Sequence, residues 1–493
     1  MRIGFDHDKY TAMQSEHILK RIAEFGGKLY LELGGKLFDD THASRVLPGF
    51  RPDSKVSMLL NLKDQAELVI VISAEDIEKN KTRGDLGITY DADVLRLIDA
   101  FRGIGMYVGS VVLTRWNEQR AAVMFKQRLE SLGIHVYQHY SIEGYPYNVK
   151  HIVSDAGFGR NDYVETTRPL VLVTAPGPGS GKMAVCLSQL YQELKRGVQA
   201  GYAKFETFPI WNLSLKHPVN VAYEAATVDL DDHNMIDPYH LEAYGVTTVN
   251  YNRDIEIFPV LSAVFQQIYG KSPYASPTDM GVNMVGNCII DDDICRDAAH
   301  QEIIRRYYSA RCALRQGHGE QTQVEKLEML LQKSGLSDDD RPVIAAARSR
   351  AEETGAPAAA LQLPDGRIIT GKTTNLLGPS AALLLNALKA LGGIEKSAHL
   401  IAPSVIEPIQ SLKCDYLGNH NPRLHTDEVL LALSISAATD ERAALAMKQL
   451  HQLKGCEVHT TVILSSVDVN IFKRLGVNLT SDPQYQTHKL YHK

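Results

Sequence analysis

A cluster of small and basic residues stands where a predicted buried strand passes into a predicted helix. Its members are Gly177, Gly179, Ser180, Gly181 and Lys182, within the segment 175–183. Glycines let the backbone turn tightly and bring successive N–H groups to one anion, and the start of a helix adds partial positive charge. A lysine at that start supplies a full charge to the same anion. The segment therefore predicts a binding site for a phosphate group or another small anion.

This glycine loop departs from both common nucleotide-binding patterns. In the pattern G-x-x-x-x-G-K-[ST], Pro176 replaces the first glycine and Met183 replaces the hydroxyl residue that binds Mg²⁺. In the pattern G-x-G-x-x-G, Lys182 stands where the last glycine belongs. Ser180 or Thr174 could supply the missing hydroxyl, so a nucleotide with Mg²⁺ is the candidate cofactor. The alternative is that the glycines only let a strand turn into a closely packed helix.

Four charged residues are candidates for chemistry on a bound phosphate compound. Arg253, Asp254 and Glu256 lie together in the segment YNRDIE, and in a strand the two carboxylates would share one face. They suit metal binding or proton transfer, and the arginine suits charge stabilisation in a transition state. Asp155 is the fourth, because its glycine-rich segment precedes the loop and could fold over the same ligand. The polar segment 205–280 predicts loops that line a site.

Two further sets of residues admit a binding or a structural interpretation. The segment 365–380 contains Gly-Lys-Thr-Thr and Gly-Pro-Ser before a predicted helix, which indicates either a second anion cradle or a turn with a helix cap. A second set has the residue types that bind Zn²⁺, in spacings that match no standard zinc pattern. Its members are Cys414, His420, His425, Asp427, Glu428, Cys456 and His459. Residues 425–428 are more simply the capped start of a helix.

The order of predicted elements indicates how the candidate residues are positioned. Helices are predicted at 10–25, 91–103, 117–132 and 182–196, buried strands at 67–73 and 169–175, and further strands at 107–114 and 134–139. Alternation of this kind is typical of a parallel sheet with crossover helices. We predict an α/β protein with a Rossmann-like three-layer α/β/α core and a mostly parallel sheet. A helical segment and a second α/β domain follow towards the C-terminus.

Composition shifts divide the chain into four predicted segments. They are a Rossmann-like domain at 1–165, the glycine-loop region with polar loops at 166–290, a helical subdomain at 291–354 and a C-terminal α/β domain at 355–493. The boundary near 355 follows from the stretch GAPAAA after a third helix, whose first turn contains Pro342.

Charge and hydropathy exclude several classes of protein. The 493 residues include 52 basic and 58 acidic side chains, a net charge of −6, which argues against a dedicated nucleic-acid binder. No apolar run approaches the ~20 residues that cross a bilayer, and the N-terminus lacks the pattern of a secretory signal. Six scattered cysteines indicate reduced thiols. We expect a cytoplasmic protein, without nucleic-acid or membrane partners, that forms a homo-oligomer.

Five segments closely resemble a widespread bacterial family of unknown function. They read LYLELGGKLFDDTHASRVLPGF, NKTRGDLGITYDADVLRLIDAF, VTAPGPGSGKMAVCLSQLY, GYAKFETFPIWNLSLKHPVN and YNRDIEIFPVL. The resemblance runs nearly end to end and implies a multi-domain, enzyme-like α/β protein, but it assigns no catalytic residue. Some members carry the label ATP-dependent protease. This chain contains neither His-Glu-x-x-His nor Gly-x-Ser-x-Gly, so we do not expect a protease.

These observations predict an enzyme that binds a nucleotide or a phosphorylated metabolite at 175–183 and acts as a phosphotransferase or ligase. One alternative is a non-catalytic protein that binds a small phosphorylated or anionic ligand. The other is a metal-dependent hydrolase that uses the C-terminal Cys and His residues.

Overall fold

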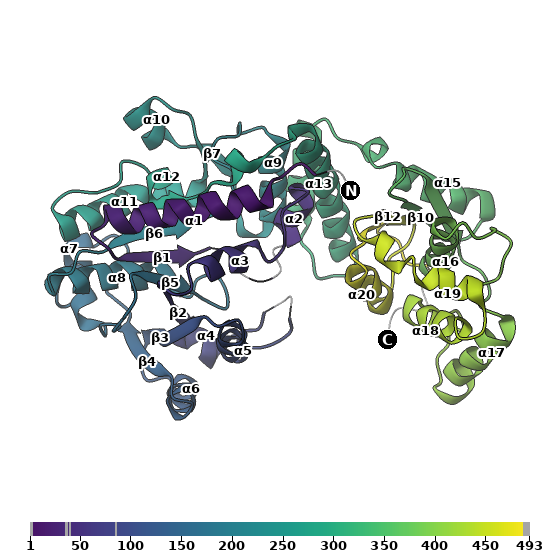
Figure 1. Cartoon of the computed structure of the whole chain (residues 1–493), viewed down its shortest axis with the longest axis horizontal. Coiled ribbons are helices and arrows are strands. Elements are labelled where there is room, and N and C mark those ends of the chain that lie inside the picture. Colours follow the sequence, from purple (N-terminus) through teal and green to yellow (C-terminus); the bar gives the residue numbers. More distant parts are fainter. Residues whose placement is uncertain (1–2, 35–37, 39–40, 84–85, 487–493) are drawn as a thin grey trace. The chain divides into compact units, whose positions relative to one another are not determined.

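The chain divides into two compact units. The computed structural model describes residues 3–34, 38, 41–83 and 86–486 (Figure 1). The N-terminal unit comprises residues up to 224 together with 231–298, and the C-terminal unit comprises 225–230 and the chain from 299 onwards. The division into four segments made from the sequence stays a prediction.

A seven-stranded sheet lies at the centre of the N-terminal unit. Its strand order is β4-β3-β2-β5-β1-β6-β9, and each of its pairings is parallel. The strands are β1 (Leu29–Leu33), β2 (Ala66–Ser73), β3 (Tyr107–Trp116), β4 (His135–Tyr140), β5 (Leu170–Thr174), β6 (Gly201–Phe205) and β9 (Gly281–Val282). Strands β1, β2 and β5 are buried along their whole length. The apolar runs predict this for β2 and β5, whereas no strand is predicted at 29–33.

Helices cover both faces of this sheet. On one face the apolar core includes side chains of α1 (His7–Glu24), α3 (Ser54–Asn61), α5 (Tyr90–Gly103) and α6 (Arg120–Ser131). On the other face it includes side chains of α7 (Val149–Ile152), α8 (Lys182–Lys195) and α11 (Asn252–Tyr269). The predicted three-layer α/β/α architecture with a mostly parallel sheet is therefore confirmed (Figure 1).

Helix α1 shows how local sequence sets these elements. Asp6 caps it by accepting a hydrogen bond of 2.9 Å from the backbone N–H of Lys9. Tyr10, Gln14, Ile18 and Ile22 then recur every four residues and are buried, so one stripe of the helix faces the sheet.

Short elements connect the main layers. They are α2 (Thr41–Val46), α4 (Ala74–Glu78), η1 (Phe158–Arg160), α9 (Pro218–Ala226), α10 (Pro238–Tyr244), α12 (Pro277–Met280), η3 (Val285–Cys288) and the antiparallel pair β7 (Asn234–Ile236) and β8 (Val249–Tyr251). The short helix η2 (Val228–Leu230) belongs to the C-terminal unit. The prediction that 205–280 consists of loops with short elements is wrong for α11, an 18-residue helix. Its buried residues Ile255, Phe258, Leu261, Phe265 and Ile268 recur at helical spacing, although Pro259 interrupts the helix interior.

The C-terminal unit contains a four-stranded sheet in the order β11-β10-β12-β13. Its strands are β10 (Ala358–Gln362), β11 (Ile368–Lys372), β12 (Glu457–Thr460) and β13 (Asn478–Ser481). The helices are α14 (Gln321–Lys333), α15 (Pro342–Thr354), α16 (Pro379–Leu391), α17 (Pro403–Ser411), α18 (Thr426–Ser436), α19 (Glu441–Met447), α20 (Ser466–Arg474) and the later part of α13 (Asp292–Arg315); the short helices are η4 (Asp338–Asp340), η5 (Leu412–Tyr416) and η6 (Leu450–Leu453). The predicted second α/β domain is confirmed.

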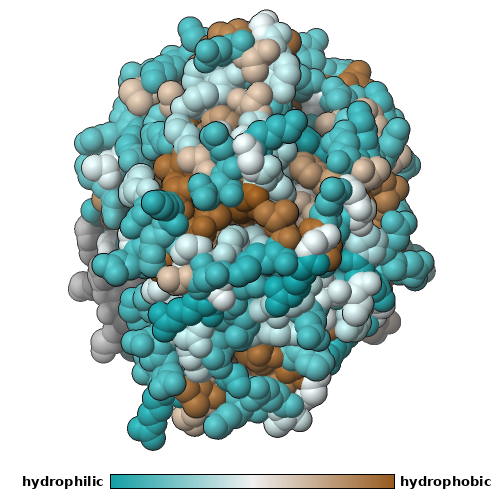
Figure 2. All heavy atoms as spheres, turned by 90° about the vertical axis from the view of Figure 1, so that its left-hand side faces the viewer, coloured by the Kyte–Doolittle hydropathy of each residue, from teal (hydrophilic) through white to brown (hydrophobic). Residues whose placement is uncertain are grey.

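The surface and helix lengths bear on the membrane prediction. Figure 2 shows hydrophilic side chains over most of one face of the protein, with apolar side chains gathered in a band across its middle. Across residues 3–34, 38, 41–83 and 86–486, no helix is both long enough and apolar enough to cross a bilayer.

Candidate functional site

The glycine loop lies at the carboxyl edge of the seven-stranded sheet. It joins the end of β5 to the start of α8, so the strand and the helix predicted around it are both confirmed. Strands β1 and β5 are neighbours in the sheet, but the strands that follow them in sequence lie in opposite directions along the strand order. Strand β2 lies beyond β5, and strand β6 lies beyond β1. Sheets of this kind bind ligands outside the carboxyl ends of strands at such a reversal. The loop therefore occupies the expected position for a ligand site.

The three glycines of the loop have different surroundings. A Cβ at Gly177 would lie 2.2 Å from the Tyr90 hydroxyl oxygen, so this glycine is required by packing. Gly181 has φ +93° and lies against Thr114. Gly179 has φ +75°, and a Cβ there would meet no atom within 4 Å. Gly179 is consequently the glycine that leaves backbone open to an approaching molecule.

Contacts within the loop fix its shape. The Ser180 hydroxyl donates to the carbonyl of Gly177 at 2.9 Å, and the Thr114 hydroxyl donates to the carbonyl of Ser180 at 2.7 Å. No side chain in the described part of the chain caps the start of α8. Among the described residues, none accepts a hydrogen bond from the backbone N–H groups of Gly179, Ser180 or Lys182. A rigid loop with open N–H groups at a helix start is suited to an anion.

Lys182 connects the loop to the neighbouring strand β1. Its Nζ lies 3.9 Å from Oε1 of Glu32, a loose ion pair with little exposure on either side chain. The other carboxylate oxygen of Glu32 accepts a hydrogen bond of 2.8 Å from the Tyr202 hydroxyl. Burial, reinforced by the Glu32 charge, raises the pKa of Tyr202 well above its ordinary value, so Tyr202 stays a donor. Lys182 is thus held beside the loop without a close hydrogen bond.

A second group of charged side chains, here called the β6 cluster, lies at the end of the next strand. Its members are Lys204, Glu206, Tyr251 and Asp254. Lys204 Nζ lies 2.7 Å from Glu206 and also forms an ion pair with Asp254. The Tyr251 hydroxyl donates to Oε1 of Glu206 at 2.7 Å. Glu32 pairs with Lys204 across β1 and β6, so the loop and the β6 cluster are adjacent at one edge.

Burial shapes the charges of the β6 cluster. It raises the pKa of Glu206 to about 7; the Lys204 ammonium opposes that rise and the Asp254 carboxylate adds to it. Burial also disfavours charge on Lys204, but the two carboxylates outweigh it and raise the pKa of Lys204 above its ordinary value. At neutral pH the cluster therefore combines a fixed ammonium with a carboxyl group that can gain or lose a proton.

The structure brings one of the four predicted catalytic residues, Asp254, into this arrangement. Asp254 and Glu256 lie in helix α11, so the prediction that they share the face of a strand is wrong. Residues two apart in a helix, such as Asp254 and Glu256, point about 200° apart around the helix axis. Glu256 is exposed to solvent. The alternating pattern DIEIF imitates a strand because Ile255 and Ile257 flank the acid. Arg253 is 56% exposed and binds Asp232 at 2.7 Å.

Asp155 does not lie near the glycine loop, contrary to the prediction. It is exposed and accepts a hydrogen bond of 2.7 Å from the hydroxyl of Tyr191, and it also forms an ion pair with Lys195. Lys195 is the last residue of α8, about 20 Å along the helix from Lys182 at the usual rise per residue. The glycine-rich segment thus covers the far end of α8.

Sequence reasoning missed Glu32, Lys204 and Glu206. A signal was present, because each is a charged residue within or directly after a buried apolar strand, where charges are rare without a partner. Their convergence could not be foreseen, since β1 and β6 are far apart in sequence and become neighbours only in the folded sheet.

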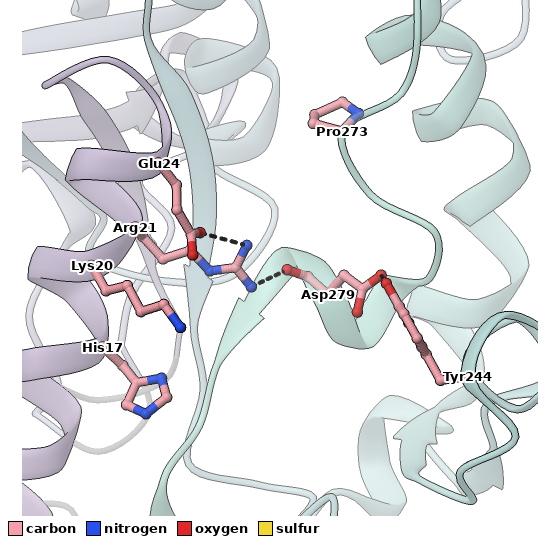
Figure 3. Close-up of a pocket in the computed structure, with 7 residues that line it drawn as sticks. All are labelled: His17, Lys20, Arg21, Glu24, Tyr244, Pro273 and Asp279. Carbon is pink, nitrogen blue, oxygen red and sulfur yellow. Dashed lines mark hydrogen bonds and ion pairs between the residues drawn. The ribbon is translucent and has the colours of Figure 1, made fainter.

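A cavity of about 250 Å³ lies elsewhere in the N-terminal unit (Figure 3). Figure 3 shows His17, Lys20 and Arg21 of α1 facing Asp279 and Tyr244. These residues come from the end of α1, which leads into β1, and from the segment before β9. The cavity therefore adjoins the amino edge of the sheet, and none of the predicted site residues lines it.

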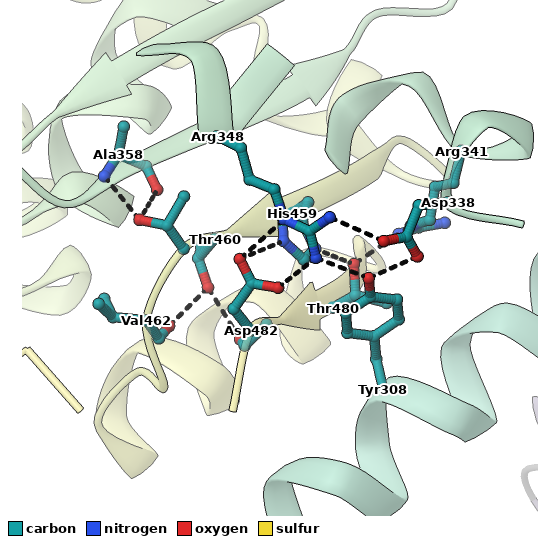
Figure 4. A network of polar contacts seen from close by, with 12 residues as sticks. Tyr308, Asp338, Arg341, Arg348, Ala358, His459, Thr460, Val462, Thr480 and Asp482 are labelled. Carbon is teal, nitrogen blue, oxygen red and sulfur yellow. Dashed lines mark hydrogen bonds and ion pairs between the residues drawn. The ribbon is translucent and has the colours of Figure 1, made fainter. Parts of the chain in front are cut away.

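The C-terminal Cys and His residues have structural contacts. His425 forms a capping box with Glu428 at the start of α18, which confirms the helix-cap interpretation. His459 bonds to the Thr480 hydroxyl at 2.9 Å within the polar network of Figure 4. In the described parts of the chain, no three His, Cys, Asp or Glu side chains are grouped to hold a metal. Segment 365–380 contains part of the antiparallel pair of β10 and β11, and it includes Gly378, the N-cap residue of α16. Anion binding by this segment stays a prediction.

Comparison with known proteins identifies similarity along nearly the whole chain. The models of the domain of unknown function DUF1846 match residues 3–335 with its N-terminal part and 339–491 with its C-terminal part. A UPF0371 protein of Streptococcus pyogenes serotype M5 is 57% identical over 491 residues, 100% of this chain and 99% of the relative. A UPF0371 protein of Corynebacterium urealyticum is 60% identical over 492 residues, with the same coverage.

Proposed function

Because the chain belongs to the DUF1846 family, whose description assigns no activity, we propose from the site itself that it is an enzyme acting on a phosphate-bearing ligand. The ligand is a nucleotide or a phosphorylated metabolite bound at 175–183, and the reaction is of the transferase or ligase type. One observation carries this proposal. Glu32 contacts Lys182 of the glycine loop and pairs with Lys204 of the β6 cluster, so an anion site adjoins a buried set of acid–base groups.

The loop supplies the groups that a phosphate needs. Open N–H groups near Gly179 donate to its oxygens, and the Lys182 ammonium offsets its charge. The β6 cluster supplies the groups that a reaction needs, because Glu206 can exchange a proton and Lys204 can stabilise negative charge. The loop and the β6 cluster both lie at the carboxyl edge of the sheet, where other parallel α/β sheets bind their ligands.

The fit of a nucleotide with Mg²⁺ is partial. The loop suits phosphate, but the buried Ser180 hydroxyl is used within the loop, where it donates to the carbonyl of Gly177. The hydroxyl ligand that ordinary phosphate-binding loops offer to Mg²⁺ is thus not directed at a ligand here. A nucleotide would be held by the loop and Lys182, and no step of the proposal depends on the metal.

Ligand-dependent thermal stabilisation tests the proposal. The panel contains inorganic phosphate, nucleotides and sugar phosphates, each with and without Mg²⁺, on the wild type, Lys182→Gln and the matched control Lys195→Gln. A ligand at 100 times its Kd stabilises the folded state by about 2.7 kcal/mol. We expect stabilisation by one class of phosphate compound in the wild type and Lys195→Gln, and its loss in Lys182→Gln. Absence of stabilisation by every phosphate compound would overturn the proposal.

The non-catalytic alternative makes a different prediction for the same ligand. Under this alternative, the ligand binds through Lys182 but is not converted to product. Substitutions in the β6 cluster then leave the affinity for the ligand unchanged. For the metal-dependent hydrolase, the described residues provide no ligand group, so no observation favours it.

A further inference from the structure

The glycine loop and the β6 cluster are separated by one strand. The loop follows β5, the cluster is built at the end of β6, and β1 lies between them. Neighbouring strands are about 4.8 Å apart, so the two sites are about 10 Å apart across the sheet. With a hydrogen bond of about 3 Å at each end, a molecule that joins them spans at least roughly 4 Å. Free phosphate is too short, whereas a small phosphorylated organic molecule has this length.

The β6 cluster offers the hydrogen-bonding groups that recognise hydroxyls. Lys204 and Tyr251 both bind Oε1 of Glu206, and among the described residues none donates to Oε2. A carboxylate oxygen is an acceptor, and a hydroxyl is a natural donor to it. Oε2 of Glu206 is not among the fully buried side-chain atoms that lack a partner, so a bound molecule can reach this oxygen.

Aromatic rings lie beside these groups. Tyr223 stacks on Phe208 with ring centroids 5.2 Å apart and an interplanar angle of 12°, and Tyr223 also stacks on Tyr251 at 6.3 Å. Tyr223 and Tyr251 are only half-buried. Rings next to carboxylates suit a molecule that has both C–H faces and hydroxyl groups.

We propose that the molecule anchored at the glycine loop is a phosphorylated polyol of sugar size, and that Glu206 takes a proton from one of its hydroxyl groups. This inference rests on the proposed function and names its substrate class. The phosphate at the loop then anchors the molecule, and the reacting hydroxyl lies at the other end.

The charged groups around Glu206 are consistent with proton exchange. Lys204 on β6, Asp254 on α11, Tyr251 at the end of β8 and Tyr223 on α9 face it. Burial raises the pKa of Glu206 to about 7, which makes its carboxylate a better proton acceptor than an ordinary glutamate.

The step balances within a group transfer to the polyol from a second substrate, a nucleotide that is not the molecule anchored at the glycine loop. The proton of the hydroxyl moves to Oε2 of Glu206 while the hydroxyl oxygen bonds to the group being transferred. The bond from that group to its nucleotide breaks, and the leaving group departs with the bonding electrons. Glu206 then releases its proton to water. Lys204 keeps its charge throughout and stabilises the negative charge that develops on the oxygen.

Calorimetric titration with defined probes tests the substrate class. The probes are inorganic phosphate, glycerol 3-phosphate, ribose 5-phosphate, glucose 6-phosphate, adenosine monophosphate, and unphosphorylated ribose and glucose. We expect a sugar phosphate to bind the wild type about tenfold more tightly than inorganic phosphate, from one or two added hydrogen bonds. Glu206→Gln should remove most of that preference and leave inorganic phosphate within about twofold. The exposed variant Glu242→Gln is the control. If adenosine monophosphate is the one probe that binds more tightly than inorganic phosphate, the polyol is the ribose of a nucleotide.

The outcomes separate this inference from the proposed function. If inorganic phosphate binds through Lys182 but sugar phosphates bind no more tightly, or Glu206→Gln keeps the preference, the inference fails and the proposed function stands. If no phosphate compound binds, both fail. Should Glu206→Gln not fold, Tyr251→Phe removes the hydroxyl that orients Glu206 and should weaken the same preference.

Proton exchange on binding gives a second readout. Titration of the tightest sugar phosphate at pH 7 in two buffers of different ionisation enthalpy measures the protons exchanged. The phosphate group, whose second pKa is about 6, exchanges some protons in both proteins. We expect an additional fraction of one proton per site in the wild type that is lost in Glu206→Gln. Equal proton exchange in both proteins would overturn the role of Glu206.

Discussion

Lys182 Nζ lies 3.9 Å from Oε1 of Glu32, close enough to attract but too far for a strong hydrogen bond. An anion at the glycine loop would meet both the attraction of Lys182 and the repulsion of Glu32. Replacing Glu32 with Gln removes that repulsion and keeps an oxygen to accept from Tyr202.

We expect Glu32→Gln to bind inorganic phosphate about fivefold more tightly, since a unit charge ~8 Å away at intermediate polarity contributes ~1 kcal/mol. Calorimetry at low and high salt measures this, and the gain should shrink as salt screens the charge. Weaker binding by the variant would instead mean that Glu32 holds Lys182 in its binding position.

The packing role of Gly177 makes a separate prediction about stability. In Gly177→Ala the new methyl group would overlap the buried ring of Tyr90, which must move. We expect a loss of about 1–3 kcal/mol, as for other overpacked sites. In the Tyr90→Ala background the same change should cost much less, a non-additivity that thermal unfolding of the four proteins measures. Equal cost in both backgrounds would contradict the overlap.

Arg341 makes the strongest stability prediction in the C-terminal unit. Its guanidinium is fully buried, forms an ion pair with Glu457, and donates to the carbonyls of Val458 at 3.0 Å and Asn478 at 2.9 Å. Lysine has neither the planar shape nor the number of donors. Arg341→Lys keeps the charge but leaves buried carbonyl groups without donors, and should destabilise the unit by about 1–3 kcal/mol, measured by urea unfolding.

The exposed pair Arg350–Glu353 provides the matched control for Arg341. Arg350→Lys should change the stability by less than about 0.5 kcal/mol, as is usual for surface ion pairs. A comparable loss in both variants would show that the buried contacts of Arg341, which joins the network of Figure 4 through Thr480, do not govern stability.

His139 predicts a dependence of stability on pH. Burial lowers its pKa to about 4 in the folded protein, against about 6.5 when unfolded. The unfolded chain therefore binds more protons in this window, and stability falls as pH falls from about 6.5 to 4. The stability lost at pH 4 relative to neutral pH is at most about 3 kcal/mol. In His139→Gln, urea unfolding across this range should show a shallower decline; an unchanged slope would contradict the prediction.

The elements with one dominant pattern could be predicted from sequence. Strand β2 and strand β5 are continuous apolar runs, and the glycine loop between β5 and α8 carries its own turn chemistry. Helix α11 could not be recognised as readily, because DIEIF alternates like a strand and Pro259 suggests a break. The helical spacing of its apolar residues becomes evident only when the sequence as far as Ile268 is considered.

The site itself was only partly predictable. Lys182 and the loop glycines follow from local spacing, and the structure places them at the expected edge. The β6 cluster depends on which strands become neighbours, and the order β5-β1-β6 cannot be read from local pattern. Glu32 stands alone in an apolar strand until β6 brings Lys204 beside it. The family resemblance inferred from five segments is confirmed by the match over the chain.

The position of β1 constrains how the protein is made. Both partners of this strand come later in the chain, and its register joins Leu29 to Leu170 and to Gly201. At a synthesis rate of about 5–20 residues per second, β1 therefore emerges from the ribosome roughly 7–30 s before its first partner. During that time LYLEL exposes unpaired backbone and apolar side chains. The nascent chain is thus most vulnerable to aggregation before its central strand can be enclosed.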